Sequence, residues 1–308
     1  MLVPRVLRRL NLDAGLHPRG QTHLSAASGL VRVGRMLYVV ADDEHHLGMF
    51  EEAAPPATPL ALLRLFDGDL PHGKKNRKAA KPDLETLAYL PPLSGFPHGA
   101  LLAMGSGSRP NRETGVMLAL DAHGDPTGYI AALNLVPLYA PLRDRFSDLN
   151  IEGAFVTGGE LHLLQRGNQR DGINACIRFD WNLLAPWLAG QRTRGPVAKA
   201  VSSIVVGDID GVPLGLTDGA ALSAGAWVFC AVAENTSDSY QDGACAGAVV
   251  GVVGPDGTVQ QRHALQRAPK VEGIAVQSAG ATLVVTLVTD ADDPAIASEL
   301  LELVLPGI

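Results

Sequence analysis

Acidic residues recur in this chain at the start of similar segments, and acidic side chains that gather in one place can bind a metal ion or transfer protons. Glu85, Glu152 and Glu272 each open a segment made of a short apolar strand, a turn at glycine and a second apolar strand. Ser28 and Thr217 open two further segments of the same design. Because adjacent strands of such a unit run antiparallel, the start of the first strand lies beside the end of the second. The five opening residues are therefore predicted to gather at one mouth of a common channel.

The spacing of these segments predicts the fold. They recur at intervals of 55 to 67 residues, and the residues before Ser28 and after Glu272 together make one more unit of that size. A regular period of this length is typical of propeller blades. We predict an all-β fold, a five-bladed β-propeller with four-stranded antiparallel blades, spanning residues 1–308 as a single domain. The N-terminal strand, from Val3 to Leu12, should complete the last blade and close the ring.

Two alternatives concern the secondary structure. A large β-sandwich would also contain many short strands, but its strands would be evenly spaced without the longer period. Glycine (34 residues) and proline (21 residues) separate the apolar runs, and this pattern is typical of short strands joined by turns rather than of helices. Only the segment from Trp181 to Gln191 and the tail from Ala295 to Leu303 have a helical pattern.

The composition bounds the partners and the location. A chain with 46% hydrophobic and 19% charged residues is globular, and its net charge of −7 gives no electrostatic footprint for nucleic acid. No run reaches the roughly 18 apolar residues of a membrane span, and the N-terminus lacks a signal-peptide pattern. The three cysteines, Cys176, Cys230 and Cys245, form no metal-binding or disulfide pattern. We expect a cytoplasmic protein that binds neither nucleic acid nor membrane; no feature points to an oligomeric state.

Gathered carboxylates predict a metal site. They cannot all stay ionised without a cation or shared protons. Calcium takes about six to eight oxygen ligands and tolerates irregular geometry. We expect calcium to be the cofactor, with Glu85, Glu152, Glu272 and Asp218 as its ligands. Two alternatives remain: the glutamates pair with lysine and arginine side chains in a structural network, or they line a water-filled channel and are partly protonated.

Basic and amide side chains near the same mouth predict an anionic ligand. Lys81, Arg109, Arg166 and Asn168 follow or precede the strands that reach this face, and arginine binds phosphate or carboxylate through paired donors. The sequence therefore predicts that these four residues bind a small anionic substrate. The charge run 74–78 is expected to be a mobile, solvated loop.

Other side chains on this face are candidates for proton transfer or ligand contact. Glu234 and Asp42 end second strands and are the predicted general bases. His45 and His46 follow the first blade's second strand, and one of them could be a general base or a metal ligand; a surface loop is the plain alternative. Tyr240, in the loop 236–244, could pack over a ligand.

Three of the opening phrases resemble a known group of proteins. The phrases DLETLAYLP (Asp83–Pro91), NIEGAFV (Asn150–Val156) and KVEGIAV (Lys270–Val276) are similar to the blade openings of phytase-like and SdiA-regulated-like bacterial β-propellers. These are related to gluconolactonases and paraoxonases. The resemblance implies a propeller and a central calcium ion on the three glutamates of these phrases. In the lactonase relatives asparagines also bind the metal, and Asn168 and Asn235 match them loosely.

These observations lead to two functional hypotheses. The first is a metal-dependent, hydrolase-like propeller that acts on a small anionic phosphoester, ester or lactone, with the metal as Lewis acid. The second is a non-catalytic propeller that binds a ligand or a protein through a structural cation or a paired-charge axis. A carboxylate cluster in a pocket favours the enzyme, and a flat face with every carboxylate paired favours the binding protein.

Overall fold

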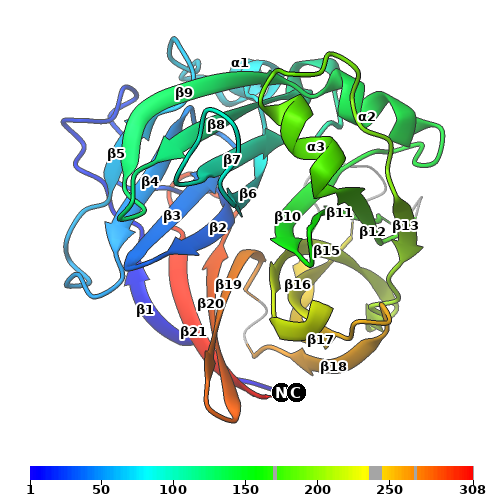
Figure 1. The fold of residues 1–308 in the computed structure, drawn as a ribbon. Coiled ribbons are helices and arrows are strands. Elements are labelled where there is room, and N and C mark those ends of the chain that lie inside the picture. Colours follow the sequence, from blue (N-terminus) through cyan, green and yellow to red (C-terminus); the bar gives the residue numbers. More distant parts are fainter. Residues whose placement is uncertain (169–171, 236–244, 267–268, 308) are drawn as a thin grey trace.

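The computed structural model describes residues 1–168, 172–235, 245–266 and 269–307. Five antiparallel sheets stand around a common axis like the blades of a propeller (Figure 1). The innermost strands of neighbouring blades contact one another in the cyclic order β2, β6, β10, β15, β19 and back to β2. The five-bladed β-propeller predicted from the repeat is confirmed.

The blades follow one another along the chain. The first contains β2 (Ala27–Val33), β3 (Met36–Ala41), β4 (His46–Glu51) and β5 (Ala61–Arg64). The second contains β6 (Leu84–Leu90), β7 (Ala100–Gly105), β8 (Thr114–Leu120) and β9 (Pro126–Asn134). The third contains β10 (Ile151–Thr157), β11 (Glu160–Gln165), β12 (Ala175–Asp180) and β13 (Ala200–Ser203). The fourth contains β15 (Val212–Ala221), β16 (Trp227–Glu234), β17 (Cys245–Val253) and β18 (Val259–Ala264), with a two-residue strand, β14 (Asp208–Ile209), added at β15.

The fifth blade joins the two ends of the chain. It contains β19 (Val271–Ala279), β20 (Thr282–Thr289), β21 (Glu299–Pro306) and, as its outer strand, β1 (Arg5–Arg9). The pairing of β1 with β21 is antiparallel, so the N-terminal strand closes the ring as predicted. The helix expected over Ala295–Leu303 is wrong, because this tail pairs on both sides, with β20 and β1, and the strand pairing outweighs the local helical pattern.

In the described part of the chain, three α-helices lie in the connections: α1 (Lys74–Ala80), α2 (Val136–Arg143) and α3 (Trp181–Leu188). The helix expected to begin at Trp181 is confirmed, with Asp180 as its N-cap residue. The mobile loop expected at 74–78 is wrong, since these residues are in α1, where Arg77 is buried and its Nε bonds to Asp43 Oδ2 at 3.0 Å. Within the described residues, no helix combines the length and the apolar character needed to cross a bilayer.

A β-bulge in every innermost strand positions the site. The register shifts between residues 27 and 29, 84 and 86, 151 and 153, 216 and 218, and 271 and 273. The residues at these shifts are Ser28, Glu85, Glu152, Thr217 and Glu272. A bulge leaves one residue outside the ladder and re-aims its side chain. The same irregularity therefore sets the direction of the opening side chain in all five blades.

Candidate functional site

A cavity of about 130 Å³ lies where the innermost strands begin. Its lining includes side chains from all five blades, among them ten carboxylates and seven lysine or arginine side chains. Such a density of buried charge costs free energy unless each charge is paired or neutralised. The contacts of this axial cavity therefore decide what it can bind.

Arg166 compensates three carboxylates of three different blades. Its Nη1 lies 3.4 Å from Glu152 Oε2 and 3.9 Å from Glu272 Oε1, and its Nη2 lies 2.5 Å from Glu234 Oε2. Burial lowers the pKa of Arg166, but the surrounding carboxylates raise it by more, so the guanidinium stays charged. Asn150 Nδ2 donates a hydrogen bond to the remaining oxygen of Glu152.

Lys270 compensates a second set of carboxylates. Its Nζ lies 3.5 Å from Glu272 Oε1, 3.4 Å from Asp290 Oδ2 and 2.7 Å from Asp292 Oδ1. It is also 3.8 Å from Glu234 Oε1. Burial lowers the pKa of Lys270, and the four carboxylates raise it well above its usual value. Lys270 and Arg166 together hold the acidic side chains of blades three, four and five.

Lys81 plays the same part between the first two blades. Its Nζ forms ion pairs with Asp42 and with Asp83 Oδ1, the latter at 2.8 Å. The other oxygen of Asp83 accepts hydrogen bonds from Arg112 Nη1 at 2.7 Å and from Ser106 Oγ at 2.6 Å. Asp83 is thus fully engaged, in a backbone conformation with φ of 59°.

Glu85 differs from its neighbours because it makes no hydrogen bond or ion pair with any described residue. Burial, and then the charges of Glu152, Asp83 and Asp42, raise its pKa well above the usual value. Carboxylate oxygens of Asp42, Asp83 and Glu85 lie within 4.8 Å of one another and could together hold a cation. Glu85 is therefore the acid for which the described part of the chain supplies no direct positive partner.

Two further glutamates have perturbed acidity. Burial raises the pKa of Glu152 to about 8, with Glu272 adding to and Arg166 opposing the shift. Burial also raises the pKa of Glu272, whose Oε2 is buried and has no hydrogen-bond partner among the described residues. Both side chains line the cavity, so each can exchange a proton with whatever occupies it.

The structure brings together eight of the ten residues that the sequence predicted for the site. The lining of the axial cavity contains Asp42, Lys81, Glu85, Glu152, Arg166, Asn168, Glu234 and Glu272. Asn168 Nδ2 donates to Asp148 Oδ2 at 2.6 Å. Arg109 lies instead in a shallow groove beside the cavity, with Lys78 and Asn111. Asn235 is exposed at the end of blade four, and Tyr240 falls outside the described residues.

Asp218 is placed away from the cavity, and the bulges explain why. In blade four the bulge falls on Thr217, which is therefore the counterpart of Glu85 and Glu152. Asp218 occupies the next position, which is a glycine in blades one, three and five. Its carboxylate accepts backbone hydrogen bonds from Gly219 at 2.7 Å and Ile274 at 3.0 Å. It thus links the innermost strands of blades four and five.

The sequence reasoning missed a repeated position two residues before each axial glutamate. Asp83, Asn150 and Lys270 stand at this position, and all three line the cavity. Each contacts a charged neighbour within it. Aligning the blade openings on their glutamates, rather than reading each separately, would have identified this second ring of side chains.

The fold and site define a five-bladed β-propeller with a charged axial cavity built by all its blades. The chain belongs to the family described as a family of unknown function (DUF6929), which it matches over residues 23–305. No curated protein matches the sequence. The narrower resemblance to phytase-like and SdiA-regulated-like propellers stays a prediction.

Solved structures resemble this one in fold. An α-L-arabinofuranosidase from Podospora anserina, solved in complex with cellotriose, has a TM-score of 0.52 at 10% identity, covering 99% of each chain. A luciferin-regenerating enzyme has a TM-score of 0.46 at 11% identity, covering 99% of this chain and 97% of its own. Hydrazine synthase of Kuenenia stuttgartiensis has a TM-score of 0.39 at 12% identity; the match covers 93% of this chain and only 64% of that one. At such identities the likeness concerns the propeller fold alone.

Proposed function

We propose that the axial cavity is the active site of a hydrolase-like propeller that works with a divalent cation, calcium being the first candidate. The observation that carries this proposal is Glu85, a carboxylate without a hydrogen-bond or ion-pair partner among the described residues, placed among like charges. A hard cation with oxygen ligands would remove this imbalance. Glu85, Asp42 and Asp83 would hold it, since their oxygens lie within 4.8 Å of one another.

This ligand set differs from the one expected from the sequence. Glu152 and Glu272 already share the charges of Arg166 and Lys270, so a cation near them would meet two positive side chains. On the other side, Arg112 holds Asp83 Oδ2, and Lys81 pairs with both Asp42 and Asp83 Oδ1. Lys81 is therefore the competitor that the ion has to displace.

The other cavity residues supply proton transfer. A bound divalent cation polarises a carbonyl and lowers the pKa of water. Glu234, which pairs with Arg166, is the proposed general base. Glu152, whose pKa of about 8 keeps it protonated at neutral pH, is the proposed general acid.

The charge balance narrows the substrate. The cavity lining has three more carboxylates than cationic side chains, and Lys81, Arg166 and Lys270 are already paired. With a divalent cation bound and Glu152 protonated, the lining has no formal net positive charge to attract a doubly charged phosphoester. Among the candidate substrates, an uncharged ester or lactone therefore fits better. Sugar lactones are tested first, since the arabinofuranosidase of similar fold was solved with cellotriose.

The decisive experiment is thermal and urea unfolding of the chelator-treated protein with and without calcium. A ligand that binds only the folded state at about a hundred times its Kd adds about 2.7 kcal/mol. We expect this gain in the wild type, none in Glu85→Gln, and a tighter calcium response in Lys81→Met, which lacks the competing ammonium. Glu160→Gln is the control, because Glu160 is a buried glutamate outside the cavity lining, and this variant should keep the response. The cation site is rejected if calcium does not stabilise the wild type, or if it stabilises Glu85→Gln as much as the wild type.

Activity is tested separately with a panel of esters, lactones and phosphoesters. We expect calcium-dependent hydrolysis of an ester or lactone, with kcat reduced at least 100-fold in Glu152→Gln and calcium binding retained. Calcium binding without turnover of any panel member would reject the hydrolase and leave the cation a structural role.

The second candidate is a paired-charge binding propeller without catalysis. The observation that favours it is the complete pairing of Arg166 and Lys270 with carboxylates of blades three to five. It predicts that calcium changes nothing and that a small polar ligand raises the melting temperature of the wild type.

A further inference from the structure

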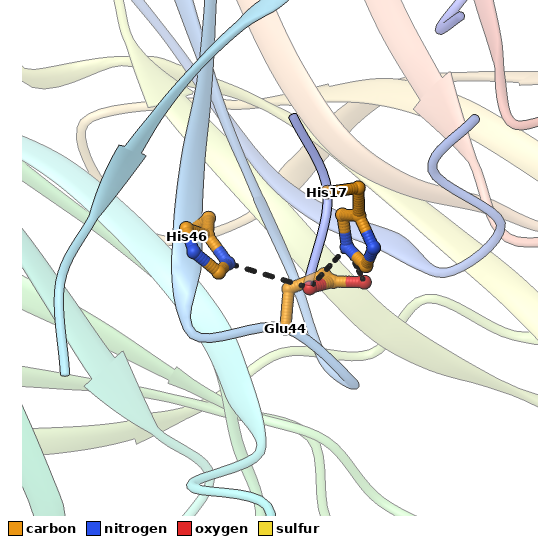
Figure 2. A group of neighbouring side chains, drawn as sticks. All are labelled: His17, Glu44 and His46. Atoms are coloured by element: carbon orange, nitrogen blue, oxygen red, sulfur yellow. Dashed lines mark hydrogen bonds and ion pairs between the residues drawn. The ribbon is translucent and has the colours of Figure 1, made fainter. Parts of the chain in front are cut away.

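Three buried side chains outside the axial cavity form a compact cluster: His17, Glu44 and His46 (Figure 2). His17 lies in the loop between β1 and β2, Glu44 in the turn after β3, and His46 begins β4. Their residues are only 5%, 2% and 8% exposed. None of them belongs to the cavity lining described above. The cluster therefore needs an explanation of its own.

The distances in the cluster are compatible with metal ligands, and one of them does not fit a hydrogen bond. His17 Nε2 lies 3.1 Å from both oxygens of Glu44, and His46 Nδ1 lies 3.6 Å from Glu44 Oε2. The second distance is too long for a hydrogen bond. His46 Nδ1 is buried and has no hydrogen-bond partner among the described residues. Two donors at zinc bond lengths of about 2.0–2.1 Å in a tetrahedral site lie roughly 3.3 Å apart. The two observed separations fall on either side of that value.

We propose that His17, Glu44 and His46 bind a divalent transition-metal ion, with zinc as the first candidate. One nitrogen of each histidine and one oxygen of the glutamate lie within 4.8 Å of one another. Two imidazoles and one carboxylate are a donor set that zinc accepts, with a fourth position left for water. Calcium prefers oxygen ligands only, so this site and the all-carboxylate site of the cavity would select different ions.

The surroundings of Glu44 support the proposal. Arg19 Nη2 lies 2.5 Å from Glu44 Oε1, and its Nη1 lies 3.4 Å from Oε2, the oxygen that also faces both histidines. Ligating carboxylates are commonly held in this way by an outer partner. The same guanidinium reaches the backbone oxygen of Asp43 at 3.2 Å, and Asp43 lines the axial cavity. An ion at the cluster would thus fix the loop beside the mouth of the cavity.

One contact opposes metal binding and sets its strength. His17 Nδ1 accepts backbone hydrogen bonds from Arg19 at 3.2 Å and Gln21 at 3.3 Å, so the proton of the metal-free ring is on Nε2. With an ion on Nε2 the proton moves to Nδ1, and these two contacts are lost. We therefore expect weaker binding than at a site whose histidine donates to a carbonyl oxygen.

Such an ion would cross-link the loop 10–24 to blade one. The backbone pairs Leu12 with Thr22 and Leu24 with Leu10, which makes residues 10–24 a loop that folds back on itself. His17 and Arg19 lie near its tip. The ion would join this tip to blade one at Glu44, which is 27 residues after His17 in the sequence. Metal binding should accordingly protect the loop from proteolysis.

The test is zinc titration of the metal-stripped full-length protein against a chromogenic chelator, followed by cobalt substitution. We expect one ion per chain and a visible cobalt spectrum of tetrahedral type. His46→Ala and His17→Gln should weaken zinc binding at least tenfold and remove the cobalt spectrum. His45→Ala is the matched control, because His45 is adjacent in sequence but bonds through Nδ1 to Gly68 O; it should bind like the wild type. If His17→Gln does not fold, His46→Ala alone carries the comparison.

Two outcomes would overturn the proposal: a wild type that binds no zinc at the cluster, or equal affinities for His46→Ala and His45→Ala. The latter would assign the ion to other histidines of the nine in the chain. Limited proteolysis gives an independent readout, since zinc should slow cleavage within 13–21 in the wild type and not in His46→Ala. Calcium-dependent stability should not change in either variant, which separates this site from the axial one.

Discussion

Two buried polar regions of this propeller differ in whether their side chains carry charge. In the axial cavity, carboxyl groups from several blades gather around the charged side chains of Arg166, Lys270 and Lys81. In blade three, the Cys176 thiol lies 3.4 Å from His162 Nδ1, and both groups are neutral. Burial raises the pKa of Cys176 to about 12 and lowers that of His162 to about 4.

The difference shows which region is prepared for chemistry. A cysteine beside a histidine, with Glu160 3.7 Å beyond it, has the order of a nucleophile, a base and an orienting acid. A reactive cysteine needs a depressed pKa, and here the shift is in the opposite direction. The pair therefore packs, whereas the cavity keeps charges within reach of a ligand. The following changes test this contrast, from the largest expected effect to the smallest.

Among these variants, replacing Arg166 should lower the free energy of unfolding the most. Arg166→Met leaves Glu152, Glu234 and Glu272 with one cation fewer in a buried site. Loss of one partner of a buried ion pair costs about 3–5 kcal/mol. We expect the free energy of unfolding in urea to fall by that amount at pH 7.5. Arg178→Met is the control: its side chain is 39% exposed and pairs with Glu160, so it should cost less than about 1 kcal/mol.

Equal losses in the two variants would mean that the cavity is wet enough to screen its own charges. The contrast between a compensated cavity and an ordinary surface pair would then fail. A folded Arg166→Met protein of near wild-type stability would also remove the charge argument against phosphoesters.

The neutral pair of Cys176 and His162 should make the free energy of unfolding depend on pH. The unfolded state takes up a proton at His162 near pH 6.5, whereas the folded state does so only near pH 4. Since the folded pKa is lowered, this contribution is complete above pH 6.5 and is lost as the pH falls towards 4. We expect His162→Gln to remove about 2–3 kcal/mol of the decline in unfolding free energy over that range.

The measurement is urea unfolding of both proteins at several pH values between 7.5 and 4.5, and the readout is the difference between the two curves. Other groups titrate in both proteins and cancel in this difference. Parallel curves would show that His162 is solvated in the folded protein and that the interior of blade three is not dry.

The fold was predictable because its signal is repeated. Five similar segments with one period identified the blades, and the leftover ends identified the closing strand β1, although it runs only from Arg5 to Arg9. The bulges were not predictable, because a register shift depends on how two strands pair. For this reason the sequence predicts Asp218 as a metal ligand, although the bulge of the fourth blade falls on Thr217.

The carboxylates of the candidate site were predictable from the sequence, but the basic side chains that pair with them were less so. Glu272 stands in a recurring phrase, whereas Lys270 pairs with it from two residues away and needs the bulged geometry to do so. The His17 cluster had no local signal, since its members come from a loop and a turn that meet only in the folded protein. Charge pairing between blades is a property of the assembled ring.

The smallest effect should come from Glu85, a carboxylate without a hydrogen-bond or ion-pair partner among the described residues. In the presence of a chelator, Glu85→Gln removes a buried carboxyl group whose ionisation is disfavoured by burial and by its acidic neighbours, while the shape of the side chain is kept. We expect the free energy of unfolding at pH 7.5 to rise by about 1 kcal/mol, as relief of a like-charge contact typically gives. Glu160→Gln should instead destabilise, because Glu160 pairs with Lys199 and Arg178. A loss of stability in Glu85→Gln would mean that the carboxylate already has a favourable partner in solution, and the argument for a cation at Asp42, Asp83 and Glu85 would lose its basis.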